Sequence, residues 1–414
     1  MLYSLYPTDA PATRAAVAQA AAGGPEKLVF TSLHIPESSG LREFGDYLAS
    51  LHRQHGLVFC ADISPHTLEA LGIGLDDLAS LKDWGVVVAR IDFGFEPAAI
   101  RRIAEHFAIA VNASTADAAL LDALEPLSRA AGAAGRGGAA GPDSASGGGS
   151  VTGRGSVTGP DGIGRAGGGG RPDGIGRAGG DGWTGGVVGW HNYYPRPETG
   201  ITAEFFQAQS RLFEERGWPV YAFIPGETTF RAPLHLGLPM LESQRHRNSY
   251  VNHAEIKALS PAAKVVCAEG ALLPQHLDWI AALERDGILT LPLTCLDASA
   301  EFLFEHPWRV RGEVAAASWR LEGTRSGRQP RQVVNADARW KGSIQMDLPS
   351  WGRYQGEIHI MRQDRPLDPR QARVAEIARP YEALVGCVRP HMMVAFAPAG
   401  VDAAAGQAVE LPES

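Results

Sequence analysis

Short apolar runs rich in β-branched residues alternate with amphipathic stretches over the amino-terminal part of the chain. The amphipathic stretches include residues 41–56 and 203–217, which place apolar side chains at helical spacing and end at a glycine. Eight strands separated by helices predict an α/β fold, a (β/α)₈ TIM barrel over residues 1–295. An open doubly wound sheet is the alternative, but no G-x-G-x-x-G pattern follows the first apolar run. The predicted strands are residues 2–7, 27–33, 57–64, 86–93, 109–115, 186–195, 219–226 and 263–270.

After residue 291 the apolar residues recur with a period of two, and turn residues separate the segments. This pattern predicts a small, mainly-β domain over residues 300–398, followed by a tail over 399–414. One short helix is expected near residues 368–377. The segments with strand-like alternation are residues 308–323, 342–348, 356–363 and 386–398.

Residues 131–182 differ from the rest of the chain, because 22 of these 52 residues are glycine. The sequence GPDGIGRAGGGG (159–170) recurs almost unchanged as RPDGIGRAGGDG (171–182). Such a segment has too few large apolar side chains to offset its ordering entropy, so we predict a disordered insertion. A glycine-rich phosphate loop is the alternative, but it requires a preceding strand and a following helix, and neither is predicted here.

Composition restricts the function further. The net charge is −8 without a basic run, which argues against a nucleic-acid partner. No apolar run approaches the roughly 20 residues of a membrane helix, and the amino terminus has no apolar signal-peptide segment. We therefore expect a cytoplasmic protein that does not bind membranes. Metal-ligand motifs and cofactor fingerprints are also missing from the sequence, so we predict neither a metal nor a cofactor. Four scattered cysteines are expected to be reduced core thiols: Cys60, Cys267, Cys295 and Cys387.

Polar side chains follow many of the predicted strands, most densely in GWHNYYPRPETG (189–200). In a parallel barrel the carboxyl ends of the strands meet at one mouth, where active sites lie. Carboxylates beside amide and guanidinium groups suit acid–base chemistry on an anionic substrate. The candidate catalytic residues are Asp62, Asp92 and Glu242. The candidate binding residues are Arg90, Asn112, His191, Asn192, Tyr194, Arg196 and Arg245.

Each candidate also has a structural explanation. Asp62 could cap the helix that follows it, and Glu242 could begin a helix. Arg90 and Asp92 point the same way from one strand and could form an internal ion pair. A single histidine such as His191 is more often a satisfied interior residue than a catalyst.

Eight short motifs follow one another along the chain: LYSLYP (2–7), FTSL (30–33), ADISP (61–65), ARIDFG (89–94), VNAST (111–115), WHNYYPRPETG (190–200), GLPMLE (237–242) and GSIQMDLPSWGRYQGEIHI (342–360). In order and spacing this set resembles the MupG-type 6-phospho-N-acetylmuramidases. The resemblance implies a TIM barrel followed by a cyclophilin-like β domain. It also implies hydrolysis of the β-1,4 bond of N-acetylmuramic acid 6-phosphate–N-acetylglucosamine during peptidoglycan recycling. The family motifs carry over onto Asp62, Arg90, Asp92, Asn112, His191, Asn192 and Glu242.

Hydrolysis of a glycoside requires a proton donor and a second carboxylate that activates water or attacks the anomeric carbon. Our hypothesis assigns these tasks to Asp92 and Glu242, with Asp62 as an orienting or alternative member. The acetamido group of the substrate could also act as the nucleophile. The expected partner is a small phosphosugar disaccharide, whose phosphate would contact Arg90, Arg196 and Arg245 unless these arginines pair internally. Hydrolysis of another phosphorylated glycoside and non-catalytic phosphosugar binding are the alternative functions.

We expect deletion of residues 136–180 to leave activity and thermal stability nearly unchanged. Shortening a flexible loop changes its closure entropy only by about 0.6 kcal/mol per halving. Thermal unfolding of the deletion variant and of the full chain compares the two directly. A midpoint lowered by about ten degrees would contradict a disordered insertion, since a domain of this size loses only roughly 2–4 °C per kcal/mol.

Overall fold

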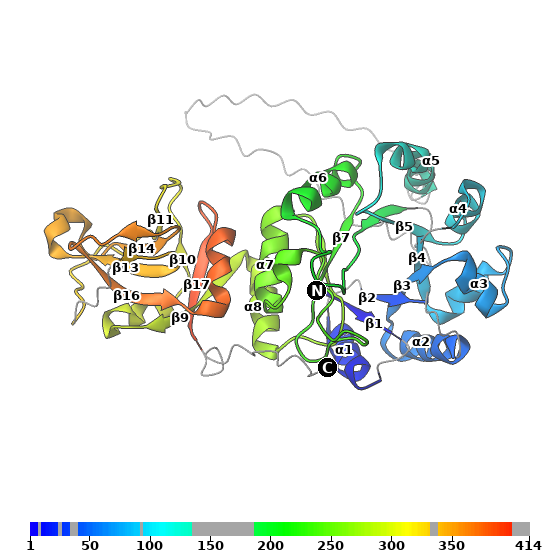
Figure 1. Cartoon of the computed structure of the whole chain (residues 1–414), viewed down its shortest axis with the longest axis horizontal. Coiled ribbons are helices and arrows are strands. Elements are labelled where there is room, and N and C mark those ends of the chain that lie inside the picture. Colours follow the sequence, from blue (N-terminus) through cyan, green and yellow to red (C-terminus); the bar gives the residue numbers. More distant parts are fainter. Residues whose placement is uncertain are drawn as a thin grey trace, which may run out of the picture.

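A closed barrel of eight parallel strands forms the amino-terminal part of the protein (Figure 1). The computed structural model describes residues 1–6, 10–23, 27–33, 40–91, 94–134, 186–331 and 338–399. The barrel closes where β1 pairs with β8, with Tyr3 opposite Cys267. The predicted TIM-barrel fold and its eight strands are confirmed. The strands are β1 (Leu2–Leu5), β2 (Leu28–Ser32), β3 (Val58–Ile63), β4 (Val86–Ile91), β5 (Ala108–Asn112), β6 (Val187–Trp190), β7 (Val220–Ile224) and β8 (Lys264–Cys267).

Helices surround the barrel and bury their apolar faces against it (Figure 1). In α2, for example, Phe44 and Leu48 are buried and Gly56 ends the helix in the left-handed region at φ 66°. The part of the chain that the structure describes contains no helix long and apolar enough to cross a membrane. The helices are α1 (Ala10–Ala22), α2 (Leu41–His55), α3 (Pro65–Leu71), α4 (Pro97–Ala104), α5 (Ala118–Ala134), α6 (Ala203–Glu214), α7 (Ser249–Leu259) and α8 (Pro274–Asp286).

Helix α5 changes one predicted boundary, because it continues to Ala134. The first four residues of the predicted insertion, 131–134, therefore belong to a helix. The remainder of the insertion lies outside the described residues, as does the predicted tail except for residue 399.

Aromatic side chains fill the interior of the barrel. Trp190 and Tyr221 stack with their ring centroids 4.3 Å apart, and Phe30 meets Phe223 edge to face at 5.0 Å. All four residues are buried. Because side chains alternate along a strand, Trp190 points into the barrel, and His191 faces outward.

A second, mainly-β domain follows α8, and its buried apolar residues continue the hydrophobic cluster that lies between the barrel strands and their helices. The strand order is β10-β17-β9-β16-β13-β14-β11, and a bridge between Val310 and Leu321 links the two edges. The strands are β9 (Ile288–Cys295), β10 (Trp308–Arg309), β11 (Ser318–Arg320), β13 (Ser343–Asp347), β14 (Ile358–Met361), β16 (Gln371–Ile377) and β17 (Met393–Pro398). Two short strands, β12 (Ala338–Arg339) and β15 (Arg365–Pro366), pair separately. Within the described residues the 3₁₀ helices are η1 (Leu78–Trp84), η2 (Glu242–Gln244), η3 (Ala298–Phe304), η4 (Pro349–Tyr354) and η5 (Arg379–Cys387).

The structure corrects three details of the sequence interpretation in this domain. Strand β9 belongs to the second sheet, so this sheet begins at Ile288 and not after residue 295. The short helix expected near 368–377 is instead β16, because this segment pairs with β13 on one side and β9 on the other. Cys295, expected in the core, is exposed at the end of β9.

A buried chain of three polar side chains connects the two domains. Helices α7 and α8 lie between the barrel and the second sheet (Figure 1), and η5 packs on α7. His276 of α8 places Nδ1 2.6 Å from Glu227 Oε1 and Nε2 2.8 Å from the hydroxyl of Tyr381 in η5. Each of these side chains is less than one tenth exposed. The contact therefore fixes the second domain on a loop of the barrel.

We expect Tyr381→Phe to lower the free energy of unfolding by about 1–3 kcal/mol, because His276 Nε2 would lose its partner in a buried position. Urea-induced unfolding measures this difference. Tyr47→Phe, at an exposed tyrosine of α2, is the matched control. Equal losses in the two variants would show that the contact between the domains contributes no stability.

Candidate functional site at the barrel mouth

Asp62, Arg90 and Asn192 form a connected polar group at the carboxyl-terminal mouth of the barrel. Asp62 on β3 and Arg90 on β4 are register partners, and Arg90 Nη1 donates to Asp62 Oδ1 at 2.9 Å. Arg90 Nη2 donates to the side-chain oxygen of Asn192, which follows β6. The side chains of Arg90 and Asp62 are only 5% and 13% exposed. Arg90 is therefore paired with Asp62, whereas the ion pair with Asp92 that the sequence left open lies outside the described residues.

Asn112 and Ser114 lie beside this group, after β5. Asn112 Oδ1 accepts the backbone N–H of Ser114 at 3.0 Å, which fixes the turn. The hydroxyl of Ser114 in turn accepts the backbone N–H of Asn192 at 3.3 Å. The ends of β3, β4, β5 and β6 thus bring together four of the predicted residues: Asp62, Arg90, Asn112 and Asn192.

Arg231 is a further polar residue of the mouth that the sequence analysis missed. Its guanidinium lies 4.0 Å from the centre of the Tyr6 ring, and its Nη1 donates to the hydroxyl of Tyr193 at 3.1 Å. Glu269 accepts the backbone N–H of Arg231 at 2.6 Å and so fixes the loop. Arg231 lies in the long connection between β7 and α7, where no hydrophobic period indicates which way a side chain points.

His191 does not lie in the mouth, contrary to its prediction as a binding residue. It is fully buried between β6 and α6, with its ring 4.9 Å from Phe206 and its Nε2 3.3 Å from the hydroxyl of Ser210. Burial, with a smaller effect of Arg90, lowers the pKa of His191 to about 3. A neutral, enclosed imidazole of this kind supports packing and cannot touch a ligand.

Glu242 holds the loop after β6 in place. Arg245 Nε and Nη2 donate to its two carboxylate oxygens at 2.6 and 2.8 Å, and the backbone N–H groups of Glu198 and Gly200 donate at 3.0 and 2.8 Å. These contacts, the Arg245 hydrogen bond foremost, lower the pKa of Glu242 to about 2. A general acid must keep its proton near neutral pH, so this environment does not suit proton donation.

Arg245 is committed to the same loop, although the sequence predicted it to bind the substrate. Its Nη2 also donates to the carbonyl oxygens of Tyr194 and Arg196, and its side chain is 5% exposed. The side chain of Arg196 is exposed, and Tyr194 is half-buried. Asp92 lies outside the described residues, so its catalytic role stays a prediction.

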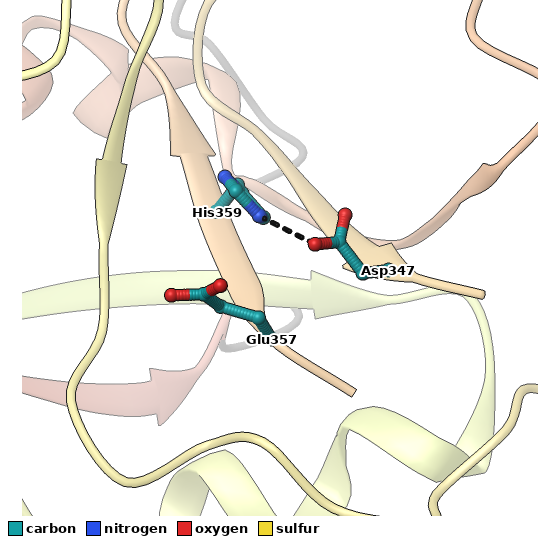
Figure 2. A group of neighbouring side chains, drawn as sticks. All are labelled: Asp347, Glu357 and His359. Carbon is teal, nitrogen blue, oxygen red and sulfur yellow. Dashed lines mark hydrogen bonds and ion pairs between the residues drawn. The ribbon is translucent and has the colours of Figure 1, made fainter. Parts of the chain in front are cut away.

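Among the described residues, one group has side chains close enough together to hold a metal ion, and it lies in the second domain: Asp347, Glu357 and His359 (Figure 2). His359 Nε2 lies 3.2 Å from Asp347 Oδ2. Glu357 already accepts hydrogen bonds from the guanidinium groups of Arg320 and Arg325. Two fixed positive charges on one of the three ligands make the group a poor cation site.

A cavity of about 770 Å³ lies at the opposite end of the barrel, lined by Leu2, Lys27 and Lys264 at the beginnings of their strands. This amino-terminal end serves stability in TIM barrels, whereas the carboxyl-terminal loops carry the chemistry. We therefore place the candidate site at the mouth around Asp62 and Arg90, not in this cavity.

A closed β/α barrel with its polar residues gathered at the carboxyl-terminal mouth has the architecture in which TIM-barrel active sites are built. The models of the 6-phospho-N-acetylmuramidase family match almost the whole chain. The N-terminal model matches residues 3–131 and 183–281, and the C-terminal model matches residues 290–397. The chain therefore belongs to the 6-phospho-N-acetylmuramidase family, a family of glycosidases.

Two solved structures share the fold over nearly their whole length. One is a conserved protein of unknown function from Enterococcus faecalis, with 22% identity, a TM-score of 0.69 and 97% of each chain covered. The other is an uncharacterised Bacillus cereus protein, with 19% identity, a TM-score of 0.66 and coverage of 96% of this chain and 98% of that one. A search among curated proteins finds no match. At these identities the two structures support the fold alone.

We expect Glu242→Gln to destabilise the protein at pH 7 by roughly 0.5–1.5 kcal/mol, because the buried Arg245 would lose its charged partner, although solvent screens the carboxylate, which is 36% exposed. The folded-state pKa of Glu242 is about 2, below the ordinary value of 4.5. Its contribution is therefore fully present above about pH 4.5 and is lost as the pH falls toward 2. Thermal unfolding at pH 7 and pH 3 should show the gap between variant and wild type shrinking in acid.

Glu105→Gln, at an exposed glutamate of α4's carboxyl end, is the control for this comparison. If Glu242→Gln loses no more stability than the control, or if its loss does not change with pH, Glu242 does not stabilise the loop after β6.

Proposed function

We propose that this protein is a cytoplasmic glycoside hydrolase that cleaves the β-1,4 bond of N-acetylmuramic acid 6-phosphate–N-acetylglucosamine during peptidoglycan recycling. The observation that carries the proposal is the Asp62–Arg90–Asn192 group at the mouth of a barrel that belongs to this family. The group combines a carboxylate with amide and guanidinium donors, as recognition and hydrolysis of an anionic sugar require.

The proposed catalytic carboxylates are Asp62 and Asp92. Asp62 lies at the end of β3 and is oriented by Arg90. Asp92 follows Arg90 by two positions in the sequence. Glu242 is not proposed as their partner, because four donors already occupy the Glu242 carboxylate. The acetamido group of the substrate remains an alternative nucleophile, with one aspartate orienting it.

The proposed ligands of the substrate's charged groups also change. Arg245 is occupied by Glu242, and Arg90 is paired with Asp62. Arg231 and Arg196 take over the contact with the phosphate, since Arg231 borders the mouth beside Tyr193 and Arg196 is exposed after β6. Asn112, Asn192 and Tyr194 then supply hydrogen bonds to the sugar rings.

The purified full-length protein should cleave the phosphorylated muramyl disaccharide, and mass spectrometry of the products identifies the bond that breaks. We expect kcat/KM to be roughly 10- to 100-fold lower for the unphosphorylated disaccharide, because charge-assisted hydrogen bonds to the phosphate would be lost. Asp62→Asn should lower turnover of the phosphorylated substrate by roughly 10²- to 10⁴-fold.

Arg211→Gln, at an exposed arginine of α6, is the control for a change of charge outside the mouth. Binding of both disaccharides without any product would identify a sugar-binding protein and refute the hydrolase. Equal rates on both disaccharides would refute recognition of the phosphate. Cleavage of a different phosphorylated glycoside alone would refute the substrate.

A further inference from the structure

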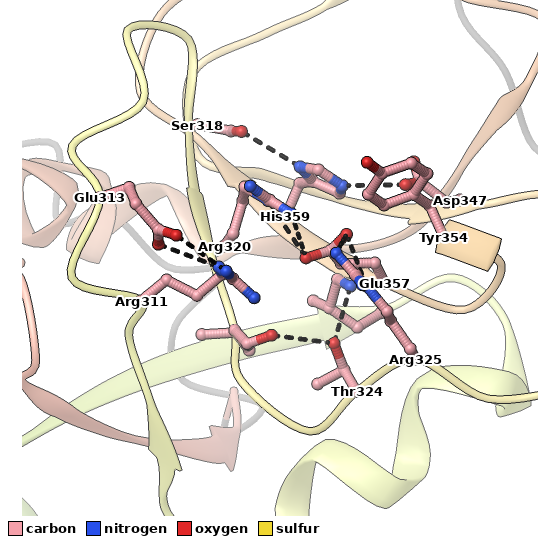
Figure 3. A network of polar contacts seen from close by, with 12 residues as sticks. Arg311, Glu313, Ser318, Arg320, Thr324, Arg325, Asp347, Tyr354, Glu357 and His359 are labelled. Atoms are coloured by element: carbon pink, nitrogen blue, oxygen red, sulfur yellow. Dashed lines mark hydrogen bonds and ion pairs between the residues drawn. The ribbon is translucent and has the colours of Figure 1, made fainter. Parts of the chain in front are cut away.

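The outer face of the second sheet carries a row of buried polar side chains that the proposed hydrolysis does not use. In β14, Ile358 and Ile360 are buried in the core, and His359 points to the opposite face. His359 Nδ1 lies 3.1 Å from the hydroxyl of Ser318, and its Nε2 meets Asp347 (Figure 3). These contacts run across β11, β14 and β13 and form a connected polar floor.

Two guanidinium groups are fixed at the edge of this floor by one carboxylate. Glu357 is 2% exposed; its Oε1 accepts Arg320 Nε and Nη2 at 3.1 and 2.8 Å, and its Oε2 accepts Arg325 Nε at 3.2 Å (Figure 3). Arg325 Nη2 lies 3.2 Å from the same oxygen. Both arginines thus use the Nε–Nη2 edge for Glu357. Within the described residues, Nη1 takes no part in these contacts in either arginine.

The Nη1 ends of Arg320 and Arg325 are accessible from solvent, as the packing and the exposure of these two side chains show. The face of Arg325 lies against the ring of Tyr354, with its guanidinium carbon 4.5 Å from the ring centre. The side chains of Arg320 and Arg325 are 25% and 40% exposed, whereas Glu357 lies beneath them. The ends that carry Nη1 and Nη2 are therefore held in a fixed orientation at the surface.

The local charge favours an anion over a cation. Glu357 supplies one negative charge for the two guanidinium groups, which leaves one net positive charge on the trio. The pKa of Tyr354 is lowered by a hydrogen bond from Arg353 and, to a smaller degree, by the charges of Arg325 and Arg320. The same positive charges oppose a metal ion on Asp347, Glu357 and His359.

We propose that Arg320 and Arg325 form a second ligand site that binds the phosphate group of a small phosphorylated metabolite. Two guanidinium ends approaching from different residues suit the tetrahedrally arranged oxygens of a phosphate monoester, and guanidinium forks bind such oxygens in a bidentate way. Glu357 acts as the positioning residue that keeps the two guanidinium groups side by side. The inference rests on contacts within the second domain and is independent of hydrolysis in the barrel.

Isothermal titration calorimetry of the full-length protein with glucose 6-phosphate and inorganic phosphate tests this site. Glucose and sodium lactate, at constant ionic strength, serve as the neutral and the carboxylate probe. We expect saturable binding of both phosphates, weakened about tenfold or more by Arg320→Gln and by Arg325→Gln. Arg370→Gln removes the same charge from an arginine that pairs with Asp368 and stacks on Trp351, so it should bind like wild type.

Unfolding midpoints of the variants verify that they are folded, as expected for the partly exposed Arg325. Wild-type affinity in both Arg320→Gln and Arg325→Gln would overturn the proposal. The two arginines and Glu357 would then form only a structural ion network. Equal weakening by Arg370→Gln would show a general charge effect and would also overturn it. Binding of lactate without binding of either phosphate would refute the phosphate assignment. The rate of disaccharide cleavage is measured separately. It tests the proposed hydrolysis in the barrel independently of the second ligand site.

Discussion

The ion pair between Glu242 and Arg245 determines the shape of the barrel mouth. Arg245, 5% exposed, joins the carboxylate to the carbonyl oxygens of the loop after β6, and the carboxylate accepts the backbone N–H of Gly200. The fit is close, since a Cβ at Gly200 would lie 2.6 Å from Glu242 Oε2. The same loop contains Asn192, whose side-chain oxygen accepts a hydrogen bond from Arg90. The polar group of the mouth therefore depends on a contact that takes no part in the proposed chemistry.

At two other places in the described part of the chain, a single glutamate carboxylate likewise accepts hydrogen bonds from several donors. Glu227 accepts the backbone N–H groups of Ser249 and Leu273 and pairs with His276, which connects two loops and the second domain. Glu357 holds two arginines at the edge of the second sheet. A carboxylate has about four acceptor positions. One glutamate can therefore accept hydrogen bonds from several backbone N–H groups of a loop or from two arginine side chains.

The regular part of the fold was predictable because its signal is periodic. The eight barrel strands follow from apolar runs, and the alternation of side chains explains why Asp62 and Arg90 meet. The position of β9 was not predictable in this way, because Ile288–Cys295 is as apolar as a barrel strand and only its pairing with β16 and β17 assigns it to the second sheet. The segment 371–377 became a strand for the same reason, since pairing overrides local preference.

The candidate site was predictable only in part. The sequence places Glu242 among polar residues after a strand, but it does not show that Arg245 and two backbone N–H groups occupy its carboxylate. The outward direction of His191 follows from the inward direction of Trp190, which a count along β6 could have found. Arg231 had no such signal, because it lies in an irregular connection.

A crystal structure of the Asp62→Asn variant with the intact phosphorylated disaccharide tests the central claim most directly. The account predicts that the sugar lies in the mouth, with the glycosidic oxygen near residue 62 and the phosphate at Arg231 or Arg196. It also predicts that Glu242 stays on Arg245. A disaccharide that contacts the Glu242 carboxylate, with Arg245 displaced, or one bound away from the mouth, would contradict the account.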